Sequence, residues 1–299
     1  MELLIGGVAA CCAGVVTNPF DVVKTRMQLQ GELRQPGKYK IHYKNILHAF
    51  YAVSKADGVL ALQKGLVPAL WYQFVMNGIR LGIYDNFEKK GLIGKSGEVS
   101  AVKSVVTGAA AGSIGAFFGS PFYMLKTQLQ AQSSGSIAVG YQHNHQSMIK
   151  ALSLIWLKQG PSALWRGVTA SVIRVACGSA VQLATFSKCK EFVQKSEVFK
   201  KDSWLNALIA SMLSGLAVAI FMTPMDVIST RLYNQGVNSS GKGILYSGIV
   251  DCIVKVLKTE NFFGLYKGFM VLFLRIGPHT ILNLLFWDEL RKLYIQFET

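Results

Sequence analysis

A motif built around proline returns twice along this chain at nearly constant spacing. Its three copies contain Pro19, Pro121 and Pro224, so the steps between them are 102 and 103 residues. A base followed by glycine also returns in each copy, at Lys64-Gly65, Arg166-Gly167 and Lys267-Gly268. Self-similarity at a fixed period indicates a repeat architecture. The sequence therefore predicts three tandem repeats.

Each of these prolines lies at the end of a long uncharged stretch. No Asp, Glu, Lys or Arg occurs in residues 3–20, 104–125 or 203–225. About twenty helical residues cross the hydrocarbon core of a bilayer. A proline inside such a helix removes a backbone hydrogen bond and kinks the axis. We therefore expect three kinked membrane helices that are followed directly by charged residues.

Three more spans are predicted at about 66–88, 168–190 and 269–291, and each contains an arginine. Between the two spans of every repeat lies an amphipathic run that is too short to cross a bilayer, at about 46–56, 148–158 and 249–259. The predicted fold is an all-α membrane protein with six transmembrane helices and three short amphipathic helices. Its three tandem repeats, with pseudo-threefold symmetry, cover residues 1–95, 96–196 and 197–299.

Composition narrows the class of function. The chain is 51% hydrophobic and carries a formal net charge of +15, which favours anionic lipid or an anionic solute as a partner. Nucleic acid is not expected, because Lys and Arg are spread over loops and helix ends. No nucleophile, metal or cofactor constellation is recognisable, so the chain is not predicted to be an enzyme. Met1 and Glu2 lead straight into the first span, and no cleavable presequence is expected.

Charged residues follow each proline at offsets of two and five. These positions hold Asp21 and Lys24, Tyr123 and Lys126, and Asp226 and Ser229. Ions at the end of a membrane helix need partners. In a ring of one handedness Asp21 meets Lys126 and Asp226 meets Lys24, which leaves Tyr123 and Ser229 as partners. We favour this wiring because the opposite handedness strands Asp21 opposite Ser229.

The repeated Pro-x-Asp-x-x-Lys element followed by Lys/Arg-Gly resembles the mitochondrial carrier family over the whole chain. The resemblance implies a monomeric, multi-pass antiporter of the mitochondrial inner membrane that works by alternating access. The short helices then face the matrix and the charged ring is a matrix gate, to which we also assign Gln28 and Gln130. Four stretches resemble the branch of members 34 and 35 of solute carrier family 25, namely 63–65, 72–82, 230–235 and 275–280. That branch is related to the fungal oxaloacetate carrier, which implies dicarboxylates, oxoacids such as oxaloacetate, and sulfur oxoanions as solutes.

A polar stripe follows the glycine of each Lys/Arg-Gly pair. Seven positions after the glycine lie Tyr72, Arg174 and Arg275, at the depth of the family's substrate contact points. Steps of four keep one helical face; the further polar residues on it are Arg80, Gln182, His279 and Asn283. Guanidinium groups bind carboxylate, sulfate or phosphate through paired hydrogen bonds. Two arginines therefore predict a small solute with two anionic ends, bound without contact to either gate.

Two further sites are implied by the resemblance. A cytoplasmic gate would consist of Asp85, Lys190, Asp288 and Arg291, with either handedness of pairing left open. The helix N-termini beside a glycine and a base suit phosphate, which with the resemblance predicts cardiolipin as a structural lipid at Gly65, Arg166, Gly167, Lys267 and Gly268. No metal or other cofactor is expected. An uncoupler-like carrier of protons or fatty-acid anions and a non-transporting membrane scaffold remain as alternatives.

Overall fold

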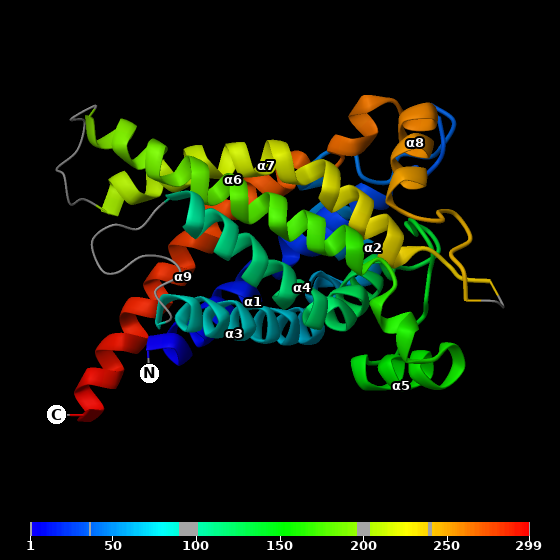
Figure 1. Ribbon diagram of the computed structural model, residues 1–299. Helices are drawn as coiled ribbons and strands as arrows, with labels where there is room; N and C mark the ends of the chain where they lie inside the picture. Colours follow the sequence, from blue (N-terminus) through cyan, green and yellow to red (C-terminus); the bar gives the residue numbers. More distant parts are fainter. Residues whose placement is uncertain (1, 36, 90–100, 196–203, 239–240, 299) are drawn as a thin grey trace.

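The computed structural model describes residues 2–35, 37–89, 101–195, 204–238 and 241–298 (Figure 1). The long helices are α1 (Glu2–Leu29), α3 (Leu66–Lys89), α4 (Ala101–Ala131), α6 (Val168–Lys195), α7 (Trp204–Asn234) and α9 (Phe269–Glu298). The short helices are α2 (Ile46–Asp57), α5 (Met148–Gln159) and α8 (Ile249–Glu260), and each is followed by a single 3₁₀ turn. The described chain thus repeats one long-short-long unit three times, which confirms the predicted fold class.

The repeats close into a ring of long helices. Within this ring α3 packs on α4, α6 packs on α7, and α9 returns to pack on α1. The short helices α2, α5 and α8 gather at one end of the molecule, and both termini lie at the other end (Figure 1). Every repeat therefore contacts both others, and residues at equal positions in the repeats come to equal depth.

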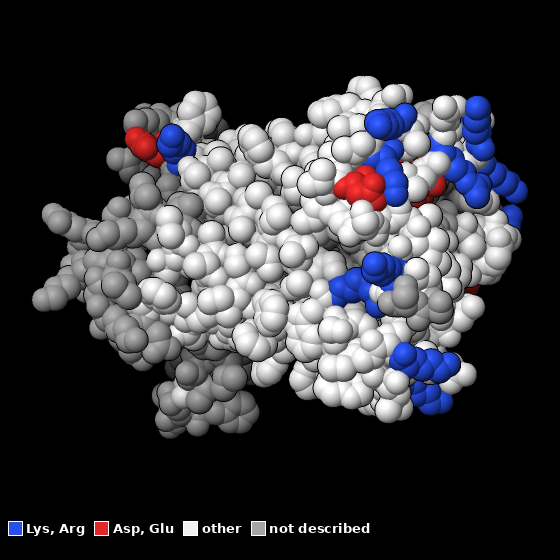
Figure 2. Space-filling model, turned by 45° about the vertical axis from the view of Figure 1, so that its right-hand side comes forward, with Lys and Arg blue, Asp and Glu red and all other residues white. Residues whose placement is uncertain are grey.

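The long helices match the thickness of a bilayer. Each has between 24 and 31 residues, and at about 1.5 Å per residue even the shortest extends about 36 Å. Four stretches of the described chain meet the criteria of length and apolar composition for a membrane span, namely Ile5–Leu29, Pro161–Val193, Ile209–Asn234 and Phe262–Tyr294. Figure 2 shows a broad uncharged band across the middle of one face, with most of its Lys and Arg toward the end that bears the short helices.

After the proline of each repeat, one side chain donates a hydrogen bond to a backbone carbonyl of the next repeat. Arg26 Nε donates to the carbonyl of Gln130 at 3.1 Å. Gln128 Nε2 donates to the carbonyl of Tyr233 at 3.0 Å. Arg231 Nη2 completes the circle by donating to the carbonyl of Gln28 at 3.1 Å. The three donors each lie seven residues after the repeat's proline, a shared register that the sequence analysis did not use.

Two of these three donors are also tied to a short helix of their own repeat. Arg26 Nη1 lies 2.8 Å from Asp57 Oδ2 at the end of α2. Arg231 Nη1 lies 2.6 Å from Glu260 Oε1 at the end of α8. Both arginines are completely buried. A buried charge needs such partners to remain ionised, so these pairs fix the short helices against the bundle.

Replacing Arg231 tests this layer. The Arg231→Ala variant should lose about 2 to 3 kcal/mol of stability, because the buried Glu260 keeps only Lys267 as a counter-charge among the described residues and the bonds from Arg231 to Glu260 and to the Gln28 carbonyl are lost. Denaturant or thermal unfolding of the purified protein in detergent measures the loss. Lys255→Ala on the same short helix is the matched control, since the Lys255–Asp251 pair is 43% and 31% exposed and exposed pairs contribute little. Equal stability of the two variants would contradict the assignment.

Candidate functional site

Two ion pairs join the repeats just after the prolines inside α1, α4 and α7. Lys24 Nζ of α1 lies 2.7 Å from Asp226 Oδ2 of α7. Lys126 Nζ of α4 lies 2.8 Å from Asp21 Oδ2 of α1. These are the two pairings of the wiring that we favoured from the sequence. Because both contacts are charge-assisted hydrogen bonds between largely buried groups, they close the bundle at the end that bears the short helices.

The third link of the ring differs from the prediction. Tyr123 Oη donates to Asp226 Oδ1 at 3.4 Å, whereas Ser229 Oγ donates to the backbone carbonyl of Asp226 at 3.2 Å. The expectation that Tyr123 and Ser229 would be each other's partners was therefore wrong. The tyrosine is long enough to reach a carboxylate of the next repeat, and the short serine hydroxyl is satisfied within its own helix.

The two glutamines assigned to the ring have different contacts. Gln28 Nε2 donates to Asp226 Oδ2 at 2.8 Å, so it supports the carboxylate that Lys24 also binds. Gln130 Nε2 donates to Asn18 Oδ1 at 3.1 Å, and Gln130 Oε1 accepts from Thr25 Oγ1 at 3.0 Å. Gln130 thus joins repeats one and two beside the ring and makes its bonds to neutral groups.

Both predicted substrate arginines reach the ring. Arg275 Nη1 lies 3.0 Å from Asp21 Oδ1. Arg174 Nη1 lies 3.9 Å from Asp226 Oδ1, and Arg174 Nη2 donates to Tyr72 Oη at 3.0 Å. The expectation that these arginines would leave both gates untouched was wrong. Helices α6 and α9 bring the two side chains so close to the ring that the predicted substrate site and the matrix gate share the same two carboxylates.

Each arginine nevertheless has one buried N–H group without a hydrogen-bond partner among the described residues. Arg174 Nε and Arg275 Nε are buried and have no hydrogen-bond partner among the described residues. Asp21 Oδ1 likewise accepts no aligned hydrogen bond in the described part of the chain, so its contact with Arg275 is held by charge alone. Unsatisfied buried donors are costly and rare in folded proteins. They mark the place where a ligand with acceptor oxygens would gain most.

Aromatic packing positions the third corner of the site. A Cβ added at Gly119 would lie 2.9 Å from Tyr72 Cδ2, so this glycine lets the Tyr72 ring lie against α4. The Tyr72 and Tyr123 rings have centroids 5.1 Å apart, and the guanidinium of Arg174 lies 4.5 Å above the Tyr123 ring. Offset ring contacts and cation–π contacts of this kind restrict side-chain orientation. Arg174 is therefore held by the Tyr123 ring against its face and by the Tyr72 hydroxyl at its edge.

The polar groups line two adjoining cavities. The lower one, of about 100 Å³, is lined by Tyr72, Tyr123, both arginines and the four charged members of the ring, namely Asp21, Lys24, Lys126 and Asp226. The upper one, of about 340 Å³, is lined by predicted site residues Gln182, Arg275 and His279 together with neighbouring apolar and hydroxyl side chains. Arg275 and Leu272 border both cavities. The structure thus places a polar path on the side of the ring away from the short helices.

The remaining predicted site residues have the following surroundings. His279 Nδ1 lies 3.3 Å from Thr17 Oγ1. That hydroxyl donates to the Ala13 carbonyl at 2.9 Å, so His279 Nδ1 must be the donor and Nε2 is left as an acceptor. Asn283 Oδ1 is buried without a hydrogen-bond partner in the described residues. The side chain of Arg80 lies outside the described residues.

The predicted cytoplasmic gate is described in part. Asp288 Oδ2 lies 2.6 Å from Lys292 Nζ of the same helix, and the Asp288 side chain is 56% exposed. The guanidinium of Arg291 lies 5.1 Å from the centre of the Trp287 ring. The side chains of Asp85 and Lys190 lie outside the described residues, so the handedness of this gate stays a prediction.

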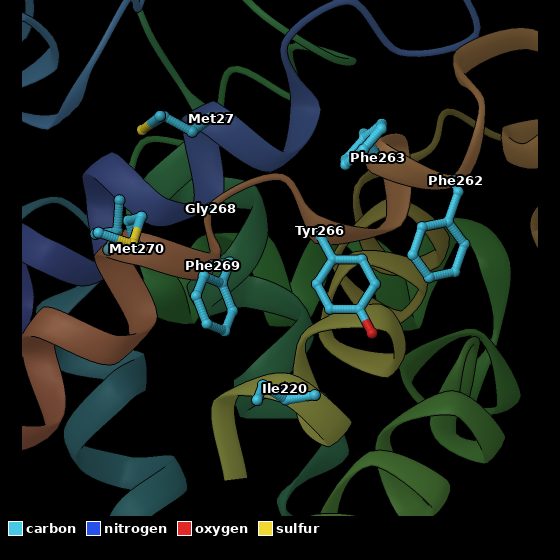
Figure 3. A pocket seen from close by; sticks show the side chains of 9 residues that line it. Met27, Ile220, Phe262, Phe263, Tyr266, Gly268, Phe269 and Met270 are labelled. Atoms are coloured by element: carbon cyan, nitrogen blue, oxygen red, sulfur yellow. The ribbon is translucent and has the colours of Figure 1, made fainter. Parts of the chain in front are cut away.

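The base of the predicted lipid site in repeat three turns toward the protein. Lys267 Nζ binds Glu260 Oε2 at 2.6 Å and the Gln30 carbonyl at 2.7 Å. Gly268 beside it has a φ of +80°, a backbone conformation that glycine adopts without strain. An apolar groove of about 450 Å³ lies next to this glycine, lined by Met27, Ile220, Phe262, Phe263, Tyr266, Phe269, Met270 and Val271 (Figure 3). Its lining therefore comes from repeats one and three.

Three equivalent repeats around a polar cavity, closed at one end by ion pairs between repeats, define a transport protein of the three-repeat membrane carrier class. A family model described as "Mitochondrial carrier protein" matches residues 1–94, 97–197 and 200–298. The chain therefore belongs to the mitochondrial carrier family, and it is a multi-pass protein of the mitochondrial inner membrane. The end that bears the short helices is accordingly the matrix end.

Curated relatives match over nearly the whole chain. "Solute carrier family 25 member 35" of Mus musculus is 54% identical over 98% of both chains. "Mitochondrial oxaloacetate transport protein" of Saccharomyces cerevisiae is 41% identical over 100% of this chain and 91% of that protein. "Mitochondrial citrate transporter E" of Aspergillus niger is 38% identical over 99% of this chain and 94% of that protein. These matches confirm the family and the branch that the sequence motifs indicated.

Charge exchange within the ring provides a test of its geometry. The double swap Lys24→Asp with Asp226→Lys should restore more transport than the double swap Asp21→Lys with Lys126→Asp. In the second case the new lysine faces Arg275, which lies 3.0 Å from Asp21, whereas Arg174 lies 3.9 Å from Asp226. Uptake by proteoliposomes of both doubles and all four singles provides the comparison. The reverse ranking would show that the arginines do not contact the ring as described.

Proposed function

We propose that this carrier exchanges small dianions across the mitochondrial inner membrane by alternating access. The solute class comprises dicarboxylates, oxoacids such as oxaloacetate, and sulfur oxoanions. The observation that carries the proposal is that the buried Nε donors of Arg174 and Arg275 have no hydrogen-bond partner among the described residues. Relatives named for oxaloacetate and citrate transport support a carboxylate solute.

The charge of the lower cavity supports a solute with two negative charges. Its lining holds four cations, Lys24, Lys126, Arg174 and Arg275, against the two carboxylates Asp21 and Asp226. Among the described lining residues two positive charges therefore remain uncompensated in a largely buried space, where charge imbalance is costly. The two arginines come from different helices, so each can bind one anionic end through paired hydrogen bonds.

The shared carboxylates give a physical link between binding and opening. An anion on Arg275 competes with Asp21, and an anion on Arg174 competes with Asp226. In the empty carrier both arginines add to the partners of the closed ring and so stabilise it. A bound dianion removes that contribution, which lowers the cost of breaking the ring, and only a solute that binds the crossing state better can drive the transition. Exchange is favoured over a leak for this reason.

We also propose that cardiolipin binds beside Gly268 as a structural lipid. The aromatic groove next to this glycine suits acyl chains, and the first backbone N–H groups of α9 suit a headgroup phosphate. Cardiolipin should raise the unfolding temperature of the purified protein, and the double change Tyr266→Ser with Phe269→Ser should reduce that gain. An undiminished gain in this variant would place the lipid elsewhere.

Replacing the arginines tests the proposed transport. Arg174→Ala and Arg275→Ala should each lower dianion exchange by about 30-fold or more, because truncating one partner of a buried charge pair costs roughly 2 kcal/mol or more. Lysine at either position should rescue poorly, since it keeps the charge but loses the planar pair of donors. Exchange is measured in proteoliposomes that are loaded with labelled dicarboxylates, oxoacids or sulfur oxoanions.

Two controls accompany this experiment. Lys150→Ala removes an exposed base of α5 whose described partner is Gln146, and exchange should be unchanged. A monocarboxylate should fail to replace the dianion, because it can occupy only one arginine. Near-normal exchange by both arginine variants would overturn the proposed site.

A further inference from the structure

A cavity at the matrix end of repeat two lies beside Arg166 and has no part in the transport site described above. It measures about 320 Å³ and lies between α5, the loop before it and the residues that follow α7. Its polar lining consists of Gln128, Tyr141, Gln142, His143, Asn144, His145, Gln159 and Arg166, and none of the described lining residues is a carboxylate. The cavity lies outside the central transport path, because it shares none of its lining with the two central cavities.

Comparison of the three repeats explains why the space is there. In repeats one and three, the base of the Lys-Gly pair lies near the acid at the end of the short helix. Lys64 Nζ lies 3.9 Å from Asp57 Oδ2, and Lys267 Nζ lies 2.6 Å from Glu260 Oε2. The same bases also bind a backbone carbonyl of the following repeat, namely those of Gln132 and Gln30. Each of these bases thus has a counter-charge and a link across the repeat boundary.

Within the described part of the chain, the base of repeat two, Arg166, has neither feature. Gln159 stands where the other repeats have Asp57 and Glu260, seven residues before the base. Arg166 Nη2 donates to Gln159 Oε1 at 3.0 Å, and among the described residues it has no carboxylate partner. A guanidinium that is partly removed from water therefore faces a cavity without a counter-charge.

Two histidines lie in the same cavity, one held by repeat three and the other by α4 of their own repeat. Their rings stack with centroids 5.4 Å apart. His143 Nε2 lies 3.0 Å from the Asn234 carbonyl, and His145 Nε2 lies 2.8 Å from Gln128 Oε1. Because both contacted atoms are acceptors, both Nε2 atoms must carry hydrogen. The Nδ1 atom of each ring has no hydrogen-bond partner in the described part of the chain, and protonation would turn it into a donor.

We propose that this cavity binds a phosphate-type oxyanion, which takes the place of the carboxylate that repeat two lacks. Arg166 supplies a planar pair of donors, the form of contact that suits an oxyanion. His143 and His145 add N–H donors once protonated, and the neutral amides of the lining complete the site. The same chemistry is offered by inorganic phosphate and by a phosphate of a lipid headgroup.

Proton uptake should accompany binding at this site. When the site is empty, burial lowers the pKa of His143 to about 4. Burial also lowers the pKa of His145. Tyr141 and Arg166 are the other titratable groups of the lining. Both imidazoles are thus neutral near pH 7 until a bound anion raises their pKa. Binding that protonates either imidazole should therefore become tighter as the pH falls toward the raised pKa.

The experiment uses purified full-length protein in detergent, titrated with inorganic phosphate at pH 6 and pH 8 by calorimetry. Arg166→Ala and Gln159→Glu should each weaken phosphate binding by about tenfold or more. Arg166→Ala removes a charge-assisted contact, whereas Gln159→Glu fills the space with an internal carboxylate. Gln159→Glu should also raise the unfolding temperature without phosphate. Gln146→Glu is the matched control, because Gln146 is exposed and outside the cavity, and it should bind as the parent does.

The remaining outcomes separate the sources of the anion from failure of the proposal. If cardiolipin stabilises the parent but not Gln159→Glu, and free phosphate has no effect, the anion at this site is a lipid headgroup. If phosphate binds the two cavity variants as well as the parent, or binds none of them and cardiolipin acts equally on all, the proposal is overturned. Loss of phosphate binding in Arg275→Ala alone would place the anion at the transport site and would also overturn it.

Discussion

Asp21 and Asp226 are the two carboxylates on which the closed state of this carrier depends. Each is buried, each binds a lysine of another repeat, and each is also approached by an arginine of the central cavity. A buried carboxylate is stable only while such partners remain. Any event that removes a partner from either aspartate therefore acts on the whole ring. This is the physical reason why binding in the cavity and opening at the matrix end are coupled.

The ring is one of two layers that join the repeats, and both are weakest around repeat two. At three positions where repeats one and three carry an ionic group, repeat two has the neutral residues Tyr123, Gln128 and Gln159. Apart from the contacts of Arg174 and Tyr123 with Asp226, the described boundary between repeats two and three is held by neutral contacts. Examples are the bond from Gln128 to the Tyr233 carbonyl and the 2.8 Å contact of Ser120 with Tyr233. Neutral hydrogen bonds contribute less than charge-assisted ones. The pseudo-threefold frame therefore has one boundary that depends less on ion pairs.

The same loss of charge produces the cavity beside Arg166. In repeats one and three the acid at the end of the short helix binds two bases, one in the first long helix and one in the Lys-Gly pair. Glu260, for example, binds both Arg231 and Lys267. When this acid becomes Gln159, Gln128 is satisfied by His145 instead, and Arg166 keeps a charge without an acidic partner among the described residues. One neutral residue thus changes the role of two neighbours.

The sequence by itself determined the three repeats, the long and short helices and the two ion pairs of the ring. It could do so because equal positions in the repeats must lie at equal depth, and because only one handedness pairs both aspartates with lysines. Depth and helical face also brought Tyr72, Arg174 and Arg275 together correctly. The sequence did not give the reach of individual side chains across the bundle. Whether Arg275 would touch Asp21, whether Tyr123 would bind Asp226 rather than Ser229, and whether Lys267 would turn to Glu260 all depend on distances between helices of different repeats. Those distances arise from packing of the whole ring, so only the tertiary structure decided them.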